Sequence, residues 1–403
     1  MSRIPIFTFV LSALFFIVSC SGQVPEATQK LSINPSTKVK VGASQTGQYL
    51  PYLKGKRIGM VVNQTSVIEG KSTVDSLLHA GIDVQTIFSP EHGFRGDADA
   101  GAQVKDGKDI KTGLPIISLY GKNKKPTTSQ FANIDIVIFD IQDVGARFYT
   151  YISTLHYVMQ TCAETGTKLI VLDRPNPNGN YIDGPILEQE HSSFVGLHSV
   201  PIVHGMTVGE YAQMINGLSW LGQDLHCDLT VIPCRHYTHN TPYDLPIKPS
   251  PNLPNNRSIY LYPSLCLFEG TIVSVGRGTD KQFQIIGHPE SKIGETSFTP
   301  IPMPGATRPK HQDKECRGFD LSNMDLDKAY QTKGINLEYL IQFYKDAKDK
   351  NSFFIPFFTK LAGTKMLQSQ IEQGMSAAEI KASWQAGLQN FRAQRKPYLL
   401  YSE

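Results

Sequence analysis

Short apolar runs alternate with amphipathic segments over the first two thirds of the chain. The apolar runs predict strands at residues 57–63, 84–88, 115–120, 134–139, 168–172 and 229–233. Segments with helical spacing lie between several of these runs, at residues 72–80, 148–164 and 207–220. Residues 134–139 are apolar nearly throughout, which is typical of a strand that is buried on both faces. This alternation predicts an α/β fold with a mostly parallel sheet that is covered by helices on both sides.

The pattern changes after residue 284. Residues 285–335 are rich in proline and glycine and contain only isolated short strands. Helical spacing returns after them, at residues 337–348, 352–361, 365–373 and 376–391. Ser376, with Glu379 three residues later, forms the capping box of a helix start. We therefore expect a sheet domain over residues 51–284 and a smaller α+β domain over residues 285–403.

The N-terminus has the pattern of a lipoprotein signal. Arg3 is followed by an apolar run over residues 4–18, which is shorter than the roughly 20 residues of a membrane-spanning helix. A small residue and Cys20 follow, in a tetrapeptide that resembles a bacterial lipobox. This predicts a signal peptide over residues 1–19, lipid modification of Cys20 and a polar tether over residues 20–50. The protein is then expected on the periplasmic or cell-surface side of a bacterial membrane, anchored by lipid; an ordinary signal with a chance cysteine is the alternative.

Composition excludes some classes of partner. The formal net charge of the 403-residue chain is +3, and it falls to +2 when Arg3 leaves with the signal peptide. Nucleic-acid-binding domains are usually much more basic, so we expect no nucleic-acid partner. No other run approaches the roughly 18 apolar residues of a membrane span. Cys20 is one of 6 cysteines, and the odd number that remains in this long chain indicates no disulfide framework.

Polar side chains gather where three of the predicted strands end. Each of the segments 89–96, 140–147 and 173–179 brings a carboxylate and an arginine. The carboxyl ends of parallel strands meet at one edge of a sheet, where ligands bind. We therefore expect a shared site there; turns with surface ion pairs are the alternative. The candidate residues are Glu91, His92, Arg95, Asp140, Gln142, Asp143, Arg147, Asp173, Arg174 and Asn176.

Carboxylates beside arginines suit a substrate that has both a scissile bond and a negative charge. A buried carboxyl group can remain protonated and act as a general acid, and arginine binds a carboxylate through two hydrogen bonds. Glu91 lies between a proline and a histidine and is the best candidate acid; a carboxylate that caps a helix is the alternative. Residues 249–278, which include Asn252, Glu269 and Arg277, are expected to form a loop around a sugar-sized ligand. Packing of the aromatic residues in this segment is the alternative.

Standard cofactor and metal signatures are absent from the sequence. It has no GxGxxG dinucleotide motif, no complete Walker A motif, no GxSxG nucleophile elbow and no HExxH zinc motif. The one metal-like group of side chains falls within residues 226–239, and its spacing matches no zinc pattern. We therefore expect neither a metal nor an organic cofactor.

Several motifs resemble those of the NamZ-like exo-β-N-acetylmuramidases, a bacterial family long catalogued as a domain of unknown function. The resemblance covers about residues 50–403, and Ser264 departs from it at a position where glycine is expected. The motifs stand in the order of the family: SPEHGFRGDADAG (89–101), FDIQDVGARFYTY (139–151), LDRPNPNG (172–179), PSPNLP (249–254), YPSLCLFEGTIVSVGRGTD (262–280) and SWQAGLQNFRAQRKPYLLY (383–401).

The resemblance implies that the protein removes N-acetylmuramic acid from the non-reducing end of peptidoglycan fragments, a reaction that needs no metal or organic cofactor. It also implies a Rossmann-like domain, a smaller second domain and a site in the cleft between them. Glu91 matches the family's proposed catalytic glutamate, so we expect it to be the general acid. Asp143 and Glu269 are candidates for the second role, as base, nucleophile or orienter of the acetamido group.

The resemblance also places substrate-binding residues in the cleft. We expect Arg147 and Arg277 to bind the lactyl carboxylate of muramic acid, and His92 to tune Glu91 or bind substrate. The other motif residues have a place in the cleft but no specific role: Arg95, Asp140, Gln142, Tyr149, Asp173, Arg174, Asn176 and Asn252.

Two other functions stay open at this point. A lipid-anchored solute-binding protein for cell-wall fragments also has two domains and a cleft, and binding of intact disaccharide without turnover would identify it. Hydrolysis of a related bond, such as an amide or a β-N-acetylglucosaminide, is the second alternative. A panel of chromogenic glycosides separates it from the muramidase.

Overall fold

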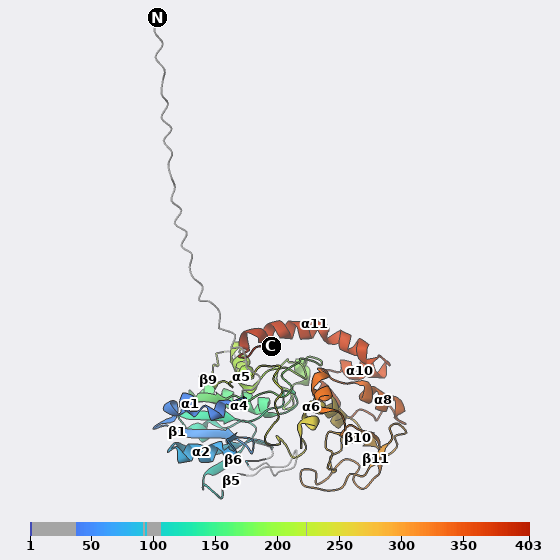
Figure 1. Cartoon of the computed structure of the whole chain (residues 1–403), viewed down its shortest axis with the longest axis horizontal. Helices are drawn as coiled ribbons and strands as arrows, with labels where there is room; N and C mark the ends of the chain where they lie inside the picture. The colour runs from blue at the N-terminus through green and yellow to red at the C-terminus, as the bar shows by residue number, and fades with distance from the viewer. Residues whose placement is uncertain (2–37, 92, 95–105, 223) are drawn as a thin grey trace.

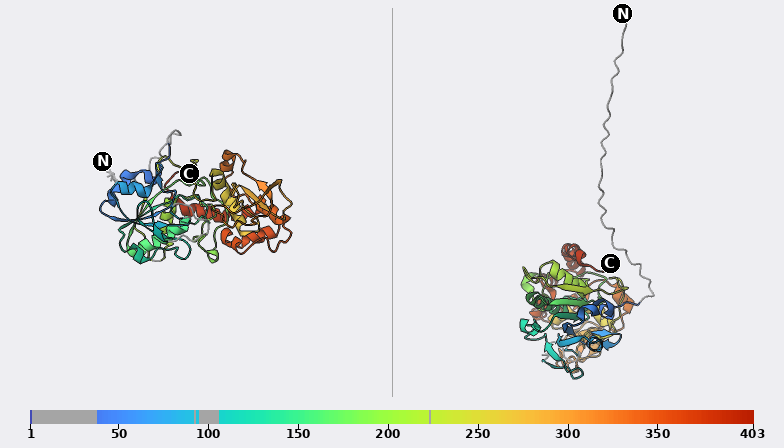
Figure 2. Two further views of the ribbon diagram at one scale, coloured as in Figure 1. Left: turned by 90° about the horizontal axis from the view of Figure 1, so that it is seen from below. Right: turned by 90° about the vertical axis from the view of Figure 1, so that its left-hand side faces the viewer.

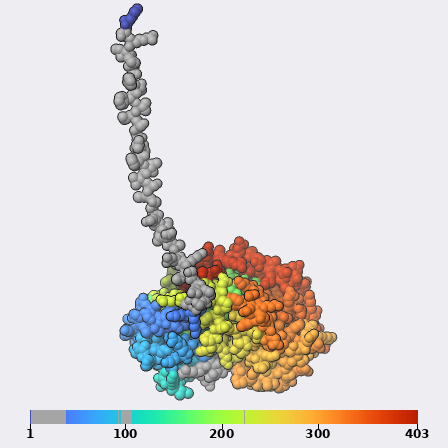
Figure 3. Space-filling model, viewed as in Figure 1, coloured from blue at the N-terminus to red at the C-terminus, as the bar shows by residue number. Residues whose placement is uncertain are grey.

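The computed structural model describes Met1 and residues 38–91, 93–94, 106–222 and 224–403. Cys20, and the predicted signal peptide apart from Met1, lie outside the described residues. An α/β part toward the N-terminus and a smaller part toward the C-terminus lie side by side (Figure 1, Figure 2). In the space-filling view, the middle of the chain, in yellow, lies between the blue and the orange parts (Figure 3).

A seven-stranded sheet forms the centre of the α/β part. Its strands are β1 (Arg57–Val62), β4 (Asp83–Ser89), β5 (Gly107–Lys108), β6 (Pro115–Ser118), β7 (Ile136–Asp140), β8 (Lys168–Leu172) and β9 (Leu229–Ile232). They stand in the order β5-β6-β4-β1-β7-β8-β9, and all neighbours are parallel except β5 and β6. The chain thus runs outward from β1 to one edge and returns to fill the other, which is the predicted Rossmann-like order. A separate hairpin pairs β2 (Val67–Ile68) with β3 (Lys71–Ser72).

The central strands are buried on both faces. Along β7, Ile136 and Ile138 belong to one hydrophobic cluster, whereas Val137 and Phe139 belong to another. Successive side chains of a strand point to opposite faces, so such a sheet needs a layer of helices on each side. The first cluster includes residues of α1 (Thr46–Leu53) and α2 (Thr73–His79). The second includes residues of α3 (Thr128–Phe131), α4 (Tyr151–Thr165) and α5 (Val208–Gly217).

Residues 42–53 contribute to the core, although part of this segment was expected to be tether. The short 3-10 helix η1 (Gly42–Ser44) leads into α1, and Tyr49 and Leu53 of α1 are fully buried. The Tyr49 hydroxyl donates a hydrogen bond to the carbonyl oxygen of Ala43 at 2.7 Å, which holds η1 against the helix.

The smaller part combines an antiparallel sheet with helices, as predicted for an α+β unit. The sheet strands are β10 (Ile285–His288), β11 (Thr296–Phe298) and β12 (Cys316–Asp320), in the order β10-β12-β11. The helices of the C-terminal third are α6 (Asn256–Leu265), η3 (Cys266–Gly270), α7 (Leu326–Gln331), α8 (Glu338–Asp346), α9 (Phe357–Ala362), α10 (Met366–Glu372), α11 (Ala377–Arg395) and η4 (Lys396–Tyr398). One further 3-10 turn, η2 (Gln189–His191), lies in the loop before α5.

A helix, α6, occupies the centre of the segment that we expected to be a loop. Asn255 and Ser258 form a capping box that starts this helix. Pro263 lies inside it and has no N–H to give to the carbonyl oxygen of Ile259, four residues earlier. The side-chain amide of Asn178 donates to that oxygen instead, at 3.2 Å. A residue far away in the sequence therefore compensates for the proline.

The two parts share one hydrophobic core. Leu340, Phe358 and Leu388 of the C-terminal helices belong to the same cluster as the α4 and α5 side chains. Helix α11 extends over both parts (Figure 1). In the described part of the chain, no helix is long and apolar enough to cross a membrane. The described cysteines are all buried and unpaired.

Candidate active site

A cavity of about 1050 Å³ lies where the two parts of the chain meet. The loops that follow β4, β6 and β7 line one side of it. Residues of α6 and η3, with residues 305–310 and 357–361, line the other side. The structure brings the following predicted site residues together in its wall: Glu91, Tyr149, Asn252, Glu269 and Arg277.

Glu91 follows β4 and is half-buried in the cavity wall. Strand β6 pairs in parallel with β4, so the residues after these two strands come close together. Burial and the adjacent Glu91 carboxylate, to which Tyr120 is hydrogen-bonded, raise the pKa of Tyr120. The Thr150 hydroxyl donates to Glu91 Oε2 at 3.2 Å. Two hydroxyl groups thus fix a carboxyl group in the cavity wall, where it can meet a bound substrate.

Glu269 and Arg277 form a second charged group in the same cavity. Arg277 Nε donates to Glu269 Oε1 at 2.6 Å, and Arg277 Nη2 donates to Oε2 at 3.0 Å. Burial opposes the charge of the guanidinium, but the Glu269 carboxylate holds the pKa of Arg277 above its usual value. About a quarter of each side chain is exposed to solvent, 25% for Glu269 and 23% for Arg277. This bidentate pair fixes the Glu269 carboxyl group in the cavity wall.

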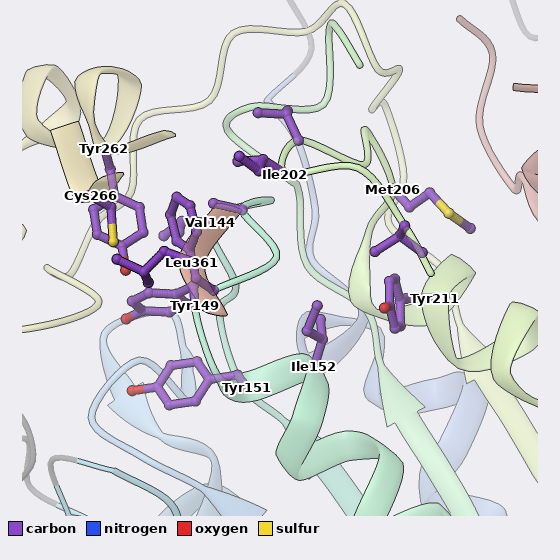
Figure 4. Close-up of a cluster of buried hydrophobic side chains, with 14 of the residues drawn as sticks. Val144, Tyr149, Tyr151, Ile152, Ile202, Met206, Tyr211, Tyr262, Cys266 and Leu361 are labelled. Atoms are coloured by element: carbon purple, nitrogen blue, oxygen red, sulfur yellow. The ribbon is translucent and has the colours of Figure 1, made fainter. Parts of the chain in front are cut away.

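Aromatic rings connect the two sides of the cavity. Tyr262 of α6 packs edge to face against Phe148 and Phe283, with ring centroids 5.3 and 5.0 Å apart. Tyr149 also packs edge to face against Tyr262, at 5.9 Å. Tyr149, Tyr262 and Leu361 lie together where the two parts meet (Figure 4). This packing fixes the loops that carry the polar groups of the cavity.

Lys310 holds the turn that carries Glu269. Its ammonium donates to the carbonyl oxygens of Phe268 and Val273, at 3.4 and 3.2 Å, and to that of Thr271. Burial lowers the pKa of Lys310 to about 8, and the nearby Glu269 carboxylate works in the opposite direction. The lysine is therefore a positioning residue for η3 and the backbone after it.

Three further cations line the cavity without a carboxylate partner among the described residues: Lys124, Arg308 and Lys360. Lys124 Nζ lies 4.5 Å from the centroid of the Phe194 ring, within the range of a cation–π contact. Arg308 and Lys360 are exposed side chains of the smaller part. These cations leave the cavity positively charged, since Glu269 already neutralises Arg277.

Asp140 and Arg174 lie away from the cavity and bind each other inside the fold. Arg174 Nε donates to Asp140 Oδ1 at 2.6 Å, and the Thr73 hydroxyl donates to Asp140 Oδ2 at 2.6 Å. Both charged side chains are almost fully buried. The strand ends do meet, as the parallel sheet requires. At this place, however, their polar groups form hydrogen bonds with one another instead of facing the cavity.

Asp173, Gln142 and Asn176 likewise fix loops rather than line the cavity. Asp173 accepts hydrogen bonds from the Tyr401 hydroxyl at 2.6 Å and from the Thr207 hydroxyl at 2.7 Å. Burial raises the pKa of Asp173 to about 6, and the Tyr401 hydrogen bond works in the opposite direction. Gln142 and Asn176 donate their side-chain amides to backbone carbonyl oxygens of neighbouring loops, at 2.7 and 2.9 Å.

Asp143 is buried and does not line the cavity. The amide of Gly145 donates to Asp143 Oδ2 at 2.6 Å, whereas Oδ1 has no hydrogen-bond partner among the described residues. Burial raises the pKa of Asp143 to about 7. Within the described part of the chain, Glu91 and Glu269 are therefore the carboxylates that line the cavity.

Arg147 lies in the core, although we expected it to bind the lactyl carboxylate. Its two terminal nitrogens donate to the backbone carbonyl oxygens of Pro185, Val200, Leu361 and Ala362, at 2.6–2.9 Å. The side chain is fully buried and does not line the cavity. It connects loops of the α/β part to the end of α9 instead of facing a ligand.

His92 and Arg95 lie outside the described residues, so their predicted roles stay predictions. Sequence reasoning missed Tyr120, Arg308 and Lys360. Tyr120 ends the predicted strand 115–120, so the rule about strand ends applied to it as well. Arg308 and Lys360 come from distant segments without a motif, and only the packing of the two parts brings them to the cavity.

Family models for the N-terminal and C-terminal parts of exo-β-N-acetylmuramidase NamZ match residues 58–257 and 260–401. Peptidoglycan β-N-acetylmuramidase NamZ of Bacillus subtilis strain 168 is 41% identical to this chain, over 99% of this chain and 100% of that protein. The predicted domain boundary after residue 284 stays a prediction.

Solved structures show the same fold. A crystal structure of a DUF1343 family protein from Bacteroides fragilis NCTC 9343 has 50% sequence identity and a TM-score of 0.85, over 91% of this chain and 100% of that one. A second DUF1343 family protein of that organism has 27% identity and a TM-score of 0.72, over 90% of this chain and 99% of that one. With both family models matched along the chain, the protein belongs to the NamZ family of exo-β-N-acetylmuramidases.

Proposed function

We propose that the cavity around Glu91 hydrolyses the β-1,4 bond of a non-reducing terminal N-acetylmuramic acid in peptidoglycan fragments. The chain is a glycoside hydrolase by its family, and its Bacillus subtilis relative is named a peptidoglycan β-N-acetylmuramidase. The observation that carries the proposal is the presence of Glu91 and Glu269 in the wall of one cavity between the two parts. Glycoside hydrolysis commonly uses two carboxyl groups on either side of the scissile bond.

In this proposal Glu91 is the general acid. Its carboxyl group gives a proton to the glycosidic oxygen as the bond to the anomeric carbon breaks. The Glu269 carboxylate, which Arg277 holds through two hydrogen bonds, stabilises the positive charge that develops at that carbon. Water then adds to that carbon as the new hydroxyl group of the released muramic acid, and its other proton returns to the Glu91 carboxylate.

We further propose that Arg308, Lys360 and Lys124 bind the lactyl carboxylate. Arg277 already gives two hydrogen bonds to Glu269, and the buried Arg147 guanidinium already donates to backbone carbonyl oxygens. The three other cations line the cavity without a carboxylate partner among the described residues, so a substrate carboxylate complements them. This would favour muramic acid over glucosamine, which lacks the lactyl group.

Release of N-acetylmuramic acid from its disaccharide with N-acetylglucosamine tests the proposal. Glu91→Gln should lower kcat about 10²–10⁴-fold, the usual contribution of a general acid, while circular dichroism shows an unchanged fold. Glu290→Gln, at an exposed carboxylate that does not line this cavity, is the matched control. Full activity of Glu91→Gln would contradict the assignment. Tight binding of intact disaccharide by the wild-type protein without turnover would favour a solute-binding role.

The lipid anchor is also a proposal. We infer that Cys20 is lipid-modified after removal of residues 1–19 and holds the enzyme on the periplasmic or cell-surface side of the membrane. The signal-like N-terminus and the lipobox-like residues support it. The polar stretch between Cys20 and residue 38, from which the folded body is described, supplies length for a tether.

A further inference from the structure

A second cavity, of about 300 Å³, lies beside the end of α11. We call it the C-terminal cavity. It shares no lining residue with the candidate active site. Among the described residues, its wall contains the cationic side chains of Lys333, Arg392 and Arg395 and the side-chain carboxylate of Glu403. His239, from the segment after β9, adds an imidazole. The cavity therefore suits a small anion.

Arg395 is a buried donor in this wall, with 4% of its surface exposed. One terminal nitrogen donates to the carbonyl oxygen of Gly205, and the other pairs with the Glu403 carboxylate. Its Nε is buried and has no hydrogen-bond partner among the described residues. Buried N–H groups are nearly always paired in folded proteins, so this arginine of the cavity wall has a hydrogen-bond donor that the described residues leave unused.

His239 presents a second orphaned atom and is 2% exposed. Its Nε2 lies 3.0 Å from Glu210 Oε1, which also accepts from the Leu400 amide at 2.8 Å. A carboxylate only accepts, so Nε2 carries the proton of this hydrogen bond. The other ring nitrogen, Nδ1, is buried without a partner among the described residues. It can accept a hydrogen bond from a hydroxyl group of a ligand.

The Glu403 carboxylate already occupies one of the cationic groups of the cavity wall. It sits against the Arg395 guanidinium, while 60% of the Glu403 side chain stays exposed. An anion with more oxygens can therefore compete for the same donors. We propose that the C-terminal cavity binds a phosphate group, with Arg395, Arg392 and Lys333 toward its anionic oxygens and His239 Nδ1 toward another oxygen. Arginine guanidinium groups suit such oxyanions because they offer several N–H donors in a fixed geometry.

The place of the cavity suggests two sources for the phosphate. The backbone of Lys40 pairs with that of Arg235 at 3.0 and 2.8 Å, and the amide of His239 donates to the Ser402 carbonyl oxygen at 3.0 Å. The cavity thus lies close to the first described residues of the folded body, where the chain arrives from Cys20. A lipid headgroup phosphate and free phosphate share the required chemistry.

Titration calorimetry of the full chain with inorganic phosphate tests the site. We expect saturable binding, weakened about tenfold by Arg392→Gln, because one charge-assisted hydrogen bond is lost. Glu403→Gln should tighten binding, since it removes the competing carboxylate. Lys396→Gln is the matched control, because it removes one positive charge, as Arg392→Gln does. Lys396 is exposed and directly follows the same helix, but it does not line the cavity.

Glycerophosphoglycerol, the soluble headgroup of phosphatidylglycerol, distinguishes the sources. If the protein binds glycerophosphoglycerol and Arg392→Gln weakens this binding, the result supports a lipid headgroup. If it binds inorganic phosphate but not glycerophosphoglycerol, the result supports free phosphate. Either result supports the site. Absence of saturable binding with either probe, or equal weakening by Arg392→Gln and Lys396→Gln, overturns the proposal. Muramidase activity should stay unchanged in these variants, so this test and the test of the proposed function fail independently.

Discussion

Glu91, Asp143 and Asp173 all follow strands of the same sheet, yet their surroundings give them different chemistry. Glu91 is half-buried beside hydroxyl groups and lines the cavity. Asp143 and Asp173 are buried away from it, and burial raises their pKa values to about 7 and about 6. A carboxyl group that reaches a substrate needs access to the cavity, and only the first of the three has it.

Asp143 should make stability depend on pH. Its folded-state pKa is about 7, well above that of an unfolded aspartate, so the folded state binds this proton more tightly. The resulting stabilisation is complete below about pH 4 and is lost as the pH rises through about 7. At roughly 1.4 kcal/mol per pKa unit, the loss is at most about 4 kcal/mol.

Asp143→Asn, which cannot ionise, should therefore gain Tm relative to the wild type as the pH rises. Calorimetric scans of both proteins at pH 5 and pH 8 measure this difference. The titration of Asp173 affects both proteins equally, so it does not contribute to the difference in Tm. A Tm difference that is the same at both pH values would show that Asp143 does not titrate in this range.

The three cations of the cavity wall lead to a prediction about specificity. Arg308→Ala should lower kcat/KM for a muramic acid glycoside about tenfold or more, which corresponds to the loss of one charge-assisted hydrogen bond. It should leave the slower hydrolysis of the matching glucosamine glycoside unchanged. Lys314→Ala, at an exposed lysine of the same segment that does not line the cavity, is the control. Equal losses on both glycosides would contradict a contact with the lactyl group.

The sequence was sufficient to predict that Glu91, Glu269 and Arg277 lie in one cleft, and all three line the cavity; their roles stay predictions. It was not sufficient to separate them from Asp140 and Arg174, whose residue types and positions look equally suitable. The difference is whether a charged side chain finds its partner inside the fold, as Arg174 does with Asp140 at 2.6 Å. That depends on contacts between distant segments, which no local pattern reveals.

At the scale of elements, Arg147 joins α9 to the loops of the α/β part. Arg147→Leu leaves four buried carbonyl oxygens without this donor, and each unpaired group costs about 1–3 kcal/mol. We expect Tm to fall by roughly 5–10 °C, while KM measured well below Tm stays the same. Arg57→Leu, which removes an exposed arginine paired with Asp135, should change Tm far less. A raised KM with an unchanged Tm would instead assign Arg147 to substrate.

Hydrophobic spacing alone predicted six of the seven strands of the central sheet and most helices, but it did not place β5 or the individual strands of the smaller sheet. The exceptions have identifiable causes. Helix α6 contains Pro263, which favours a loop locally, but Asn178 satisfies the carbonyl oxygen that the proline leaves free. Helix α1 is short and lies in a largely polar segment, and its place is set by burial of Tyr49 and Leu53 against the sheet. In both cases tertiary contacts override the local preference.

At the scale of the molecule, one continuous core joins the two parts on either side of the active-site cavity. The packing of Phe148, Tyr149 and Tyr262 holds this junction together, and the described residues that line the cavity all come after residue 90. The anchor and the catalytic body should therefore act independently. A soluble form of the enzyme is then expected to keep its activity.

Cys20→Ser tests this separation. If acyl chains on Cys20 hold the protein, at about 0.8 kcal/mol for each methylene buried in the bilayer, the variant should move from the membrane fraction to the soluble fraction of the cell. Its kcat and KM on the soluble disaccharide should equal those of the wild type, because residue 20 lies at least 70 positions along the chain from every described residue that lines the cavity. Ser19→Ala, which keeps a small residue before the cysteine, is the matched control and should stay in the membrane fraction. If Cys20→Ser remained in that fraction, another element would have to provide the anchor.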